Sequence, residues 1–137
     1  MEDPWGGECV TISGPEHVAA RQWYAENQMP VIAYSSLGRG FFSGRFASGD
    51  YETAKKVMDP FAQKGYLHEC NMRHLKAAER IAEREGVTVA QVAMAYIFHS
   101  PMNVFAVVSS KNPERIVENV AASRILLSEE DMASLEA

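Results

Sequence analysis

The chain has 137 residues, of which 47% are hydrophobic and 23% are charged, a composition typical of one globular domain and unlike that of a disordered segment. The 13 Lys and Arg against 18 Asp and Glu give a net charge of −5, which argues against a general nucleic-acid-binding surface. No apolar run approaches the length of a membrane span, and the opening residues MEDPWGGECV lack the charged and apolar regions of a signal peptide, so we expect a cytoplasmic protein.

The first dozen residues predict a loop, and the first helix is expected within residues 13–30. Ser13 and Glu16 stand at the spacing of a capping box, and Pro30 lies beyond the helix end. The next stretch, VIAYSS from Val31, is a short apolar run that ends in small polar residues. This pattern predicts a buried strand.

A long loop is expected in LGRGFFSGRFASGD, residues 37–50. Its four glycines are spaced so that no regular element fits, and the spacing matches neither a Walker nor a Rossmann phosphate loop. Long loops in compact domains are usually functional. The sequence therefore marks this segment as a candidate for binding.

Two helices are expected in the middle of the chain. In the first, apolar residues recur at three- and four-residue steps over residues 75–82, and Gly86 closes the helix. In the second, Thr88 and Gln91 form a capping box ahead of an amphipathic stripe over residues 89–97. We assign both stripes to core packing.

A second strand, two further helices and a candidate anion site are expected in the last third of the chain. Residues 104–108 favour a buried strand, Pro113 suits the first turn of a helix, and a last short helix follows Ser128. The segment between the strand and Pro113 carries two hydroxyls, an amide and a cation, and a second cation follows in the first turn of the helix. Such a cluster at a helix N-terminus predicts an anion site; its members are Ser109, Ser110, Lys111, Asn112 and Arg115.

The alternation of strands and helices favours parallel strand pairing and an α/β fold. Both strands are apolar on both sides, as strands covered on two faces are. Two strands, however, form neither a barrel nor a stable open sheet. We therefore expect a single unit over residues 1–137, with two parallel strands and about five helices, that is part of something larger.

The cysteines and histidines do not predict a metal site. Cys9 and Cys70 lie far apart and form no C-x-x-C pair, so we expect reduced thiols rather than a disulfide. Cys70 and His74 can share a helix face, with His68 nearby. A catalytic zinc needs about three protein ligands, and no third ligand follows at a metal-like spacing.

Three stretches, in order, resemble the C-terminal part of aldo-keto reductases. They are PVIAYSSLGRGFFSGRF, GVTVAQVAMAYIFHSP and VFAVVSSKNPERIVENVAASRILLSEEDMASLEA, and the resemblance covers residues 15–137. It implies a (β/α)8 TIM barrel with a nicotinamide dinucleotide, usually NADP, across the C-terminal ends of its strands. VIAYSS would be the seventh strand and VFAVVS the eighth, so the chain would be a C-terminal fragment, a partial barrel.

The resemblance also implies roles for residues around the nicotinamide and the pyrophosphate. Tyr34 would stack on the nicotinamide, because an aromatic ring occupies this position in many relatives. Arg45 stands where relatives often carry a lysine that helps to clamp the cofactor. The loop that approaches the pyrophosphate, where glycine lets backbone N–H groups come close, would contribute Ser35, Leu37, Gly38 and Gly40.

At the adenosine end, the resemblance gives the candidate anion site a ligand. Ser110, Lys111 and Arg115 match the cluster that holds the 2′-phosphate of NADP, and Glu118 and Asn119 match the pair beside the adenine. The predicted anion is therefore this 2′-phosphate. The chain departs mildly from the family pattern: it has Ser-Ser where many relatives have Gly-Ser before the lysine, and Ser-Ser-Leu where many have Ser-Pro-Leu after the first strand.

The resemblance implies an NADPH-dependent carbonyl reductase as the parent protein, acting on a small carbonyl substrate. The family's catalytic tyrosine, lysine, aspartate and histidine come from strands earlier than the seventh. We therefore assign no catalytic residue here and expect the chain alone to be inactive. Two alternatives stay open: a dinucleotide-binding or regulatory module without chemistry, and an interaction domain that uses the former cofactor face as a dimer interface.

The expected partner is the missing N-terminal part of the barrel. Two strands without it expose two edges and an apolar face that the barrel interior would cover. Leaving that face in water is costly, since apolar burial is worth about 25 cal/mol per Å². We therefore expect self-association through the strand pair, unless the loop from Gly38 folds over the face.

Overall fold

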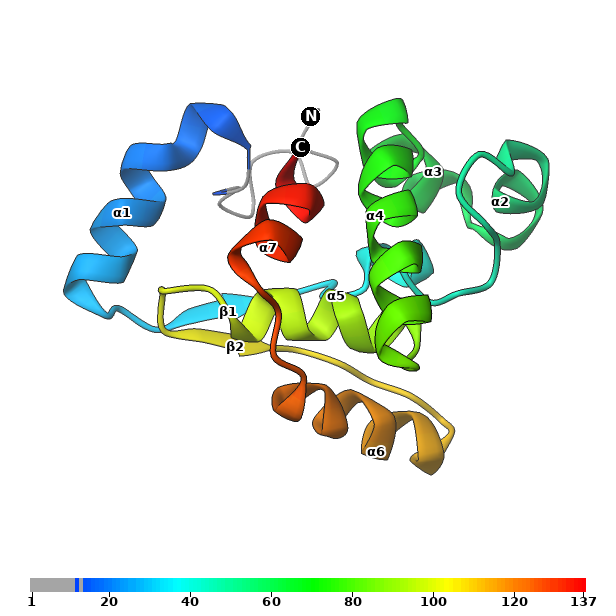
Figure 1. Ribbon diagram of the computed structural model, residues 1–137. Coiled ribbons are helices and arrows are strands. Elements are labelled where there is room, and N and C mark those ends of the chain that lie inside the picture. Colours follow the sequence, from blue (N-terminus) through cyan, green and yellow to red (C-terminus); the bar gives the residue numbers. More distant parts are fainter. Residues whose placement is uncertain (1–11, 13) are drawn as a thin grey trace.

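The computed structural model describes residue 12 and residues 14–137 (Figure 1). The predicted N-terminal loop, Cys9 and the capping box expected from Ser13 lie outside the described residues. The described chain forms seven α-helices, three 3₁₀ helices and two strands. The helices are α1 (Val18–Asn27), α2 (Tyr51–Val57), α3 (Pro60–Tyr66), α4 (Glu69–Glu85), α5 (Val89–Phe98), α6 (Pro113–Ala121) and α7 (Glu129–Glu136); the 3₁₀ turns are η1 (Pro15–His17), η2 (Gly38–Gly40) and η3 (Ala122–Arg124); the strands are β1 (Val31–Ala33) and β2 (Val104–Ala106).

The prediction of about five helices was too low, because α2 and α3 were not expected. Each has seven residues, which is two turns and too short to show a helical stripe of apolar residues. Their start signals are nevertheless present. The Asp50 carboxylate accepts a hydrogen bond from the Thr53 N–H, and the Asp59 carboxylate accepts one from the Ala62 N–H ahead of Pro60.

The strands β1 and β2 pair in parallel, as predicted, with Val31 opposite Val104 and Ala33 opposite Ala106. Both strands are shorter than expected. After Ala33, whose carbonyl still accepts a bond of 3.0 Å from the Val107 N–H, the backbone of Ser35 turns left-handed with φ 51°. A residue in this conformation cannot continue a strand.

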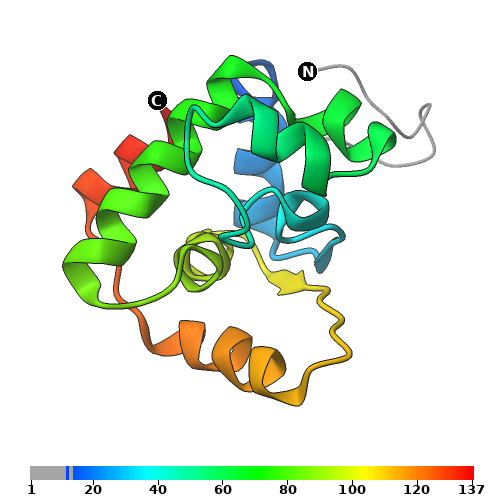
Figure 2. The ribbon, with the colours of Figure 1, turned by 90° about the vertical axis from the view of Figure 1, so that its right-hand side faces the viewer.

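One face of the strand pair is exposed, as expected for two strands that lack the rest of a barrel. Ile32 and Phe105 are cross-strand neighbours on one face, where they are 70% and 55% exposed. On the other face α5 packs against β2, and Figure 2, which looks along α5, shows this helix between α4 and α6. Within the described part of the chain, one face of the sheet therefore has a helical layer and the other faces solvent.

The core lies among the helices rather than at the sheet. One cluster joins α4, α5 and α7 around Ile81 and Val92, and the other joins the 37–50 loop to α2, α3 and α4 around Phe41 and Leu75. The segment predicted as a loop is irregular apart from η2, and two of its three phenylalanines, Phe41 and Phe46, are core residues. The longest helix, α4, thus contributes to both clusters.

The predicted start and stop signals of the later helices are confirmed. Thr88 with Gln91 and Ser128 with Asp131 form capping boxes, Asn112 caps α6, and Gly86 ends α4 with φ 66°. No helix among the described residues is long and apolar enough to cross a membrane.

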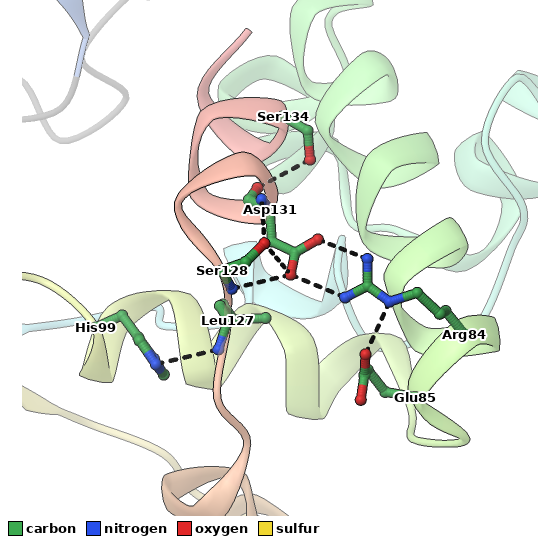
Figure 3. A network of polar contacts seen from close by, with 7 residues as sticks. All are labelled: Arg84, Glu85, His99, Leu127, Ser128, Asp131 and Ser134. Carbon is green, nitrogen blue, oxygen red and sulfur yellow. Dashed lines mark hydrogen bonds and ion pairs between the residues drawn. The ribbon is translucent and has the colours of Figure 1, made fainter.

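Asp131, which forms the capping box of α7 with Ser128, is also one partner of an ion pair (Figure 3). Both oxygens of the Asp131 carboxylate accept bonds from the Arg84 guanidinium, at 2.9 and 2.8 Å, and one of them also accepts from the N–H and hydroxyl of Ser128. Asp131 is 4% exposed. The hydrogen bonds from Arg84, and secondly those from Ser128, hold the pKa of Asp131 well below its usual range. This carboxylate therefore fastens α7 to the C-terminal end of α4.

Candidate functional site

The carboxyl ends of β1 and β2 lie at the same edge of the sheet, which follows from their parallel pairing. From this edge the two following segments, residues 34–50 and residues 107–112, leave toward the same side of the molecule (Figure 1). The first carries the predicted pyrophosphate loop, and the second leads to the predicted 2′-phosphate cluster at the start of α6. The predicted parallel pairing therefore brings the ends of the two strands side by side.

A serine that the sequence did not single out for a role joins these two segments. The Ser36 hydroxyl donates toward the carbonyl oxygens of Ala33, at 2.9 Å, and Val107, at 3.0 Å. Ser36 occupies the position where the resemblance expects a proline, which has no hydroxyl to donate. The departure from the family pattern is thus a cross-link between the ends of the two strands, and only the fold reveals its second partner.

The loop after β1 is a series of tight turns. The Ser35 carbonyl accepts from the Gly38 N–H at 2.7 Å, and the Leu37 carbonyl accepts from the N–H groups of Gly40 and Phe42. Gly38 is buried with φ 57°, and Gly40 has φ 92°, both in the left-handed region that favours glycine. Tyr34 lies between the end of β1 and these turns and is 38% exposed.

Arg45 lies against this loop rather than reaching away from it. A side chain on Gly40 would collide with the Arg45 guanidinium. The guanidinium donates to the Ser43 hydroxyl and to the Val57 carbonyl, both at 3.1 Å. Arg45 therefore links the loop to the end of α2, and its expected role as a cofactor clamp stays a prediction.

The predicted 2′-phosphate cluster lies at the N-terminus of α6. Its polar groups are ordered by local bonds: the Ser110 hydroxyl accepts from the Asn112 N–H at 3.1 Å, and the Asn112 amide oxygen accepts from the Glu114 N–H at 2.9 Å. Lys111 and Arg115 are exposed, and within the described chain neither forms a hydrogen bond or an ion pair. Two unpaired cations beside helix N–H groups are a suitable arrangement for a phosphate.

The predicted adenine pair, Glu118 and Asn119, follows on the same helix. Glu118 is exposed, and its carbonyl accepts a bond of 3.2 Å from the Gln91 side chain of α5. Asn119 is only 7% exposed, and no buried side-chain nitrogen or oxygen among the described residues lacks a hydrogen-bond partner. A carboxamide can both donate and accept hydrogen bonds, which suits the edge of an adenine base.

The residues at the strand ends and on α6 therefore fit the adenosine end of NADP. The two exposed cations suit a phosphate, the Asn119 amide suits a base edge, and the left-handed glycines Gly38 and Gly40 suit close approach of a pyrophosphate. The roles themselves stay predictions. No three metal-binding side chains gather among residues 12 and 14–137; Cys70, His74 and Glu69 lie along α4, and Cys70 is a free thiol.

Comparisons with known proteins agree with these observations. The model of the Aldo/keto reductase family matches residues 17–137. The aldo-keto reductase str7 of Strobilurus tenacellus is 26% identical over 129 residues, and the aldo-keto reductase yakc [NADP(+)] of Schizosaccharomyces pombe is 26% identical over 122 residues. These matches cover 92% and 88% of this chain but 38% and 35% of the two relatives. The chain thus spans a little over a third of the length of these curated relatives.

Proposed function

The chain belongs to the aldo/keto reductase family, and on that premise we propose that it is the C-terminal, NADP-binding portion of a carbonyl reductase. One observation carries the proposal. Arg115 and Asn119 lie on α6 and Lys111 lies two residues before its start, and neither cation forms an ion pair among the described residues. The segment that carries them leaves the same sheet edge as the glycine loop. NADP(+) also appears in the name of one relative.

We further propose that β1 and β2 are the seventh and eighth strands of a (β/α)8 barrel. Their parallel register and the helical layer on one face support this assignment. So does the exposed face with Ile32 and Phe105, which a barrel interior would cover. The rest of the barrel would be the partner of this chain, and the cytoplasmic location expected from the sequence stays a prediction.

In the bound state, NADPH would supply a hydride to the carbonyl carbon of a small aldehyde or ketone. The residues of this chain would bind and orient the cofactor. Arg115, Lys111 and Ser110 would hold the 2′-phosphate, and Tyr34 would fix the exposed side of the nicotinamide by stacking. No catalytic acid is assigned within the chain, so we expect reduction only from a protein that also contains the earlier strands.

Titration calorimetry with the chain as it stands tests the cofactor assignment. We expect weak binding of NADPH and at least about tenfold weaker binding of NADH, because NADH lacks the phosphate that two charged hydrogen bonds would hold. Equal affinities for the two dinucleotides, or tight binding of NADH, would contradict the roles of Lys111 and Arg115.

A second candidate function, self-association, is favoured by the exposed apolar face of the sheet. Ile32 and Phe105 are cross-strand neighbours on this face, and they are 70% and 55% exposed. Tyr34 and Val107, which follow directly after the two strands, are also exposed. We propose that two copies bury this face against each other in a two-fold dimer.

Light scattering over a range of concentrations is expected to show a dimer that Phe105→Lys converts to a monomer. A charge at the centre of a buried apolar contact costs more than the contact gains. Leu126→Lys is the matched control, since Leu126 is 83% exposed and follows η3, away from the strands. A wild-type chain that is monomeric at every concentration contradicts the dimer.

A further inference from the structure

The loop after β1 is backed by an aromatic side chain from a helix that the sequence did not predict. Tyr66 is the last residue of α3 and is half-buried. A Cβ atom added to Gly38 would lie 3.4 Å from Cδ1 of Tyr66, so the tyrosine ring packs on this glycine. The Ser35 hydroxyl lies close enough to the Tyr66 hydroxyl to affect the pKa of the phenol. The Tyr66 side chain therefore lies beside both ends of the turn in which the Gly38 N–H donates to the Ser35 carbonyl.

Tyr66 is itself held in place from behind. Its carbonyl accepts bonds of 2.8 Å from the Asn71 side chain and from the His68 N–H. Asn71 is a buried residue of α4, and the Tyr66 ring packs on the core cluster that contains Phe41 and Leu75. The backbone and ring of Tyr66 are thus held against α4, the longest helix among the described residues.

The hydroxyl keeps its proton under ordinary conditions. Burial raises the pKa of Tyr66 above its usual value of 10.0, against smaller opposing effects of the Ser35 hydroxyl and the Arg39 charge. A neutral phenol can share a hydrogen bond with a serine hydroxyl in either direction. Ser35 needs such support, because its left-handed backbone, with φ 51°, is strained for a residue other than glycine.

We propose that Tyr66 is a positioning residue for the cofactor: it holds Ser35 and Gly38 in the conformation that receives the pyrophosphate of NADP. This inference rests on the proposed function. Tyr66 lies outside the three stretches that carry the family resemblance. It would act through the loop after β1 rather than by touching the cofactor. The hydroxyl orients Ser35, and the ring fills the space beside Gly38.

Two ligands and two variants separate these contributions. Adenosine 2′,5′-bisphosphate has the 2′-phosphate and the adenine of NADPH but no pyrophosphate. In titration calorimetry, Tyr66→Phe is expected to bind NADPH roughly three- to tenfold more weakly than the wild type, the value of one hydrogen bond between neutral groups, with the bisphosphate unaffected. Tyr66→Ala, which also loses the ring, is expected to lose more. Tyr51→Phe, at an exposed tyrosine of α2, is the matched control and is expected to change neither affinity.

Hydrogen exchange supplies a measurement that needs no ligand. The Gly38 amide, which donates to the Ser35 carbonyl, is expected to exchange about tenfold faster in Tyr66→Ala, again the value of about one hydrogen bond. A wild-type chain that binds neither ligand overturns the proposed function, and the inference with it. A wild-type chain that binds both, with NADPH affinity and Gly38 exchange unchanged in the Tyr66 variants, overturns the inference alone, as does an equal loss of affinity for both ligands.

Discussion

Arg115→Ala is expected to lower the affinity of the chain for NADPH about 10- to 100-fold, since a hydrogen bond to a charged group is worth about 1.5–3 kcal/mol. Arg115 lies in the first turn of α6, exposed and without an ion-pair partner among the described residues. A phosphate bound there would also receive helix N–H groups and the Lys111 ammonium. The affinity for NADH, which has no 2′-phosphate, is expected to change little.

A second variant, measured by calorimetry with both dinucleotides, separates the charge of the Arg115 guanidinium from its planar shape. Arg115→Lys keeps the charge but loses the planar fork, so we expect an intermediate affinity for NADPH. Arg124→Ala is the matched control, because Arg124 is an exposed arginine beyond the other end of the same helix. An equal loss for NADPH and NADH in Arg115→Ala would show that the arginine supports the fold of α6 rather than the phosphate.

Asp131→Asn is expected to lower the free energy of unfolding at pH 7 by about 2–3 kcal/mol, somewhat less than the 3–5 kcal/mol of a fully buried pair, because Arg84 is half-exposed. The amide that replaces the carboxylate cannot accept both bonds of the guanidinium. It also weakens the capping box with Ser128. Chemical denaturation monitored by circular dichroism measures the change.

The pH dependence of this difference identifies its cause. The folded-state pKa of Asp131 lies below its unfolded value near 3.8, so the carboxylate stabilises the fold fully above about pH 4 to 5 and loses this contribution as the pH falls further. The wild type and Asp131→Asn are therefore expected to converge in stability on acidification. Glu85→Gln, at an exposed partner of the same arginine, is expected to cost less than about 1 kcal/mol. A wild-type advantage that stays constant down to pH 2 would rule out the ion pair as its source.

Local signals in the sequence predicted local structure well. Thr88, Asn112 and Ser128 cap helices as their spacing indicated, because a cap depends on groups within three residues of it. The helices α2 and α3 were missed because two turns are too short for a periodic pattern. The exposed face of the strands was expected, because two apolar strands without the rest of a barrel leave one face uncovered.

In the candidate site too, some residues could be identified from local sequence and others only from the fold. The phosphate cluster at Ser110 and Lys111 is contiguous in the sequence and could be found there. Ser36 and Tyr66 could not, because their partners at Val107 and Gly38 are brought close only by the fold. The roles of Tyr34 and Arg45 rest on the family resemblance, and the structure adds that Arg45 is already bonded to the loop and to α2.

The bond from Ser36 to Val107 joins residues 71 positions apart, and this separation bears on the order in which the chain folds. The contacts between α4 and α5 involve neighbouring segments and close only a short loop, whereas the parallel strand pair must wait until the whole intervening chain is ordered. The Ser36 bridge therefore forms late, after the helical core. Until then the backbone N–H and C=O groups along the edges of the apolar strands β1 and β2 stay unpaired. A newly made chain is therefore expected to be most prone to aggregate in the interval before its two strands meet.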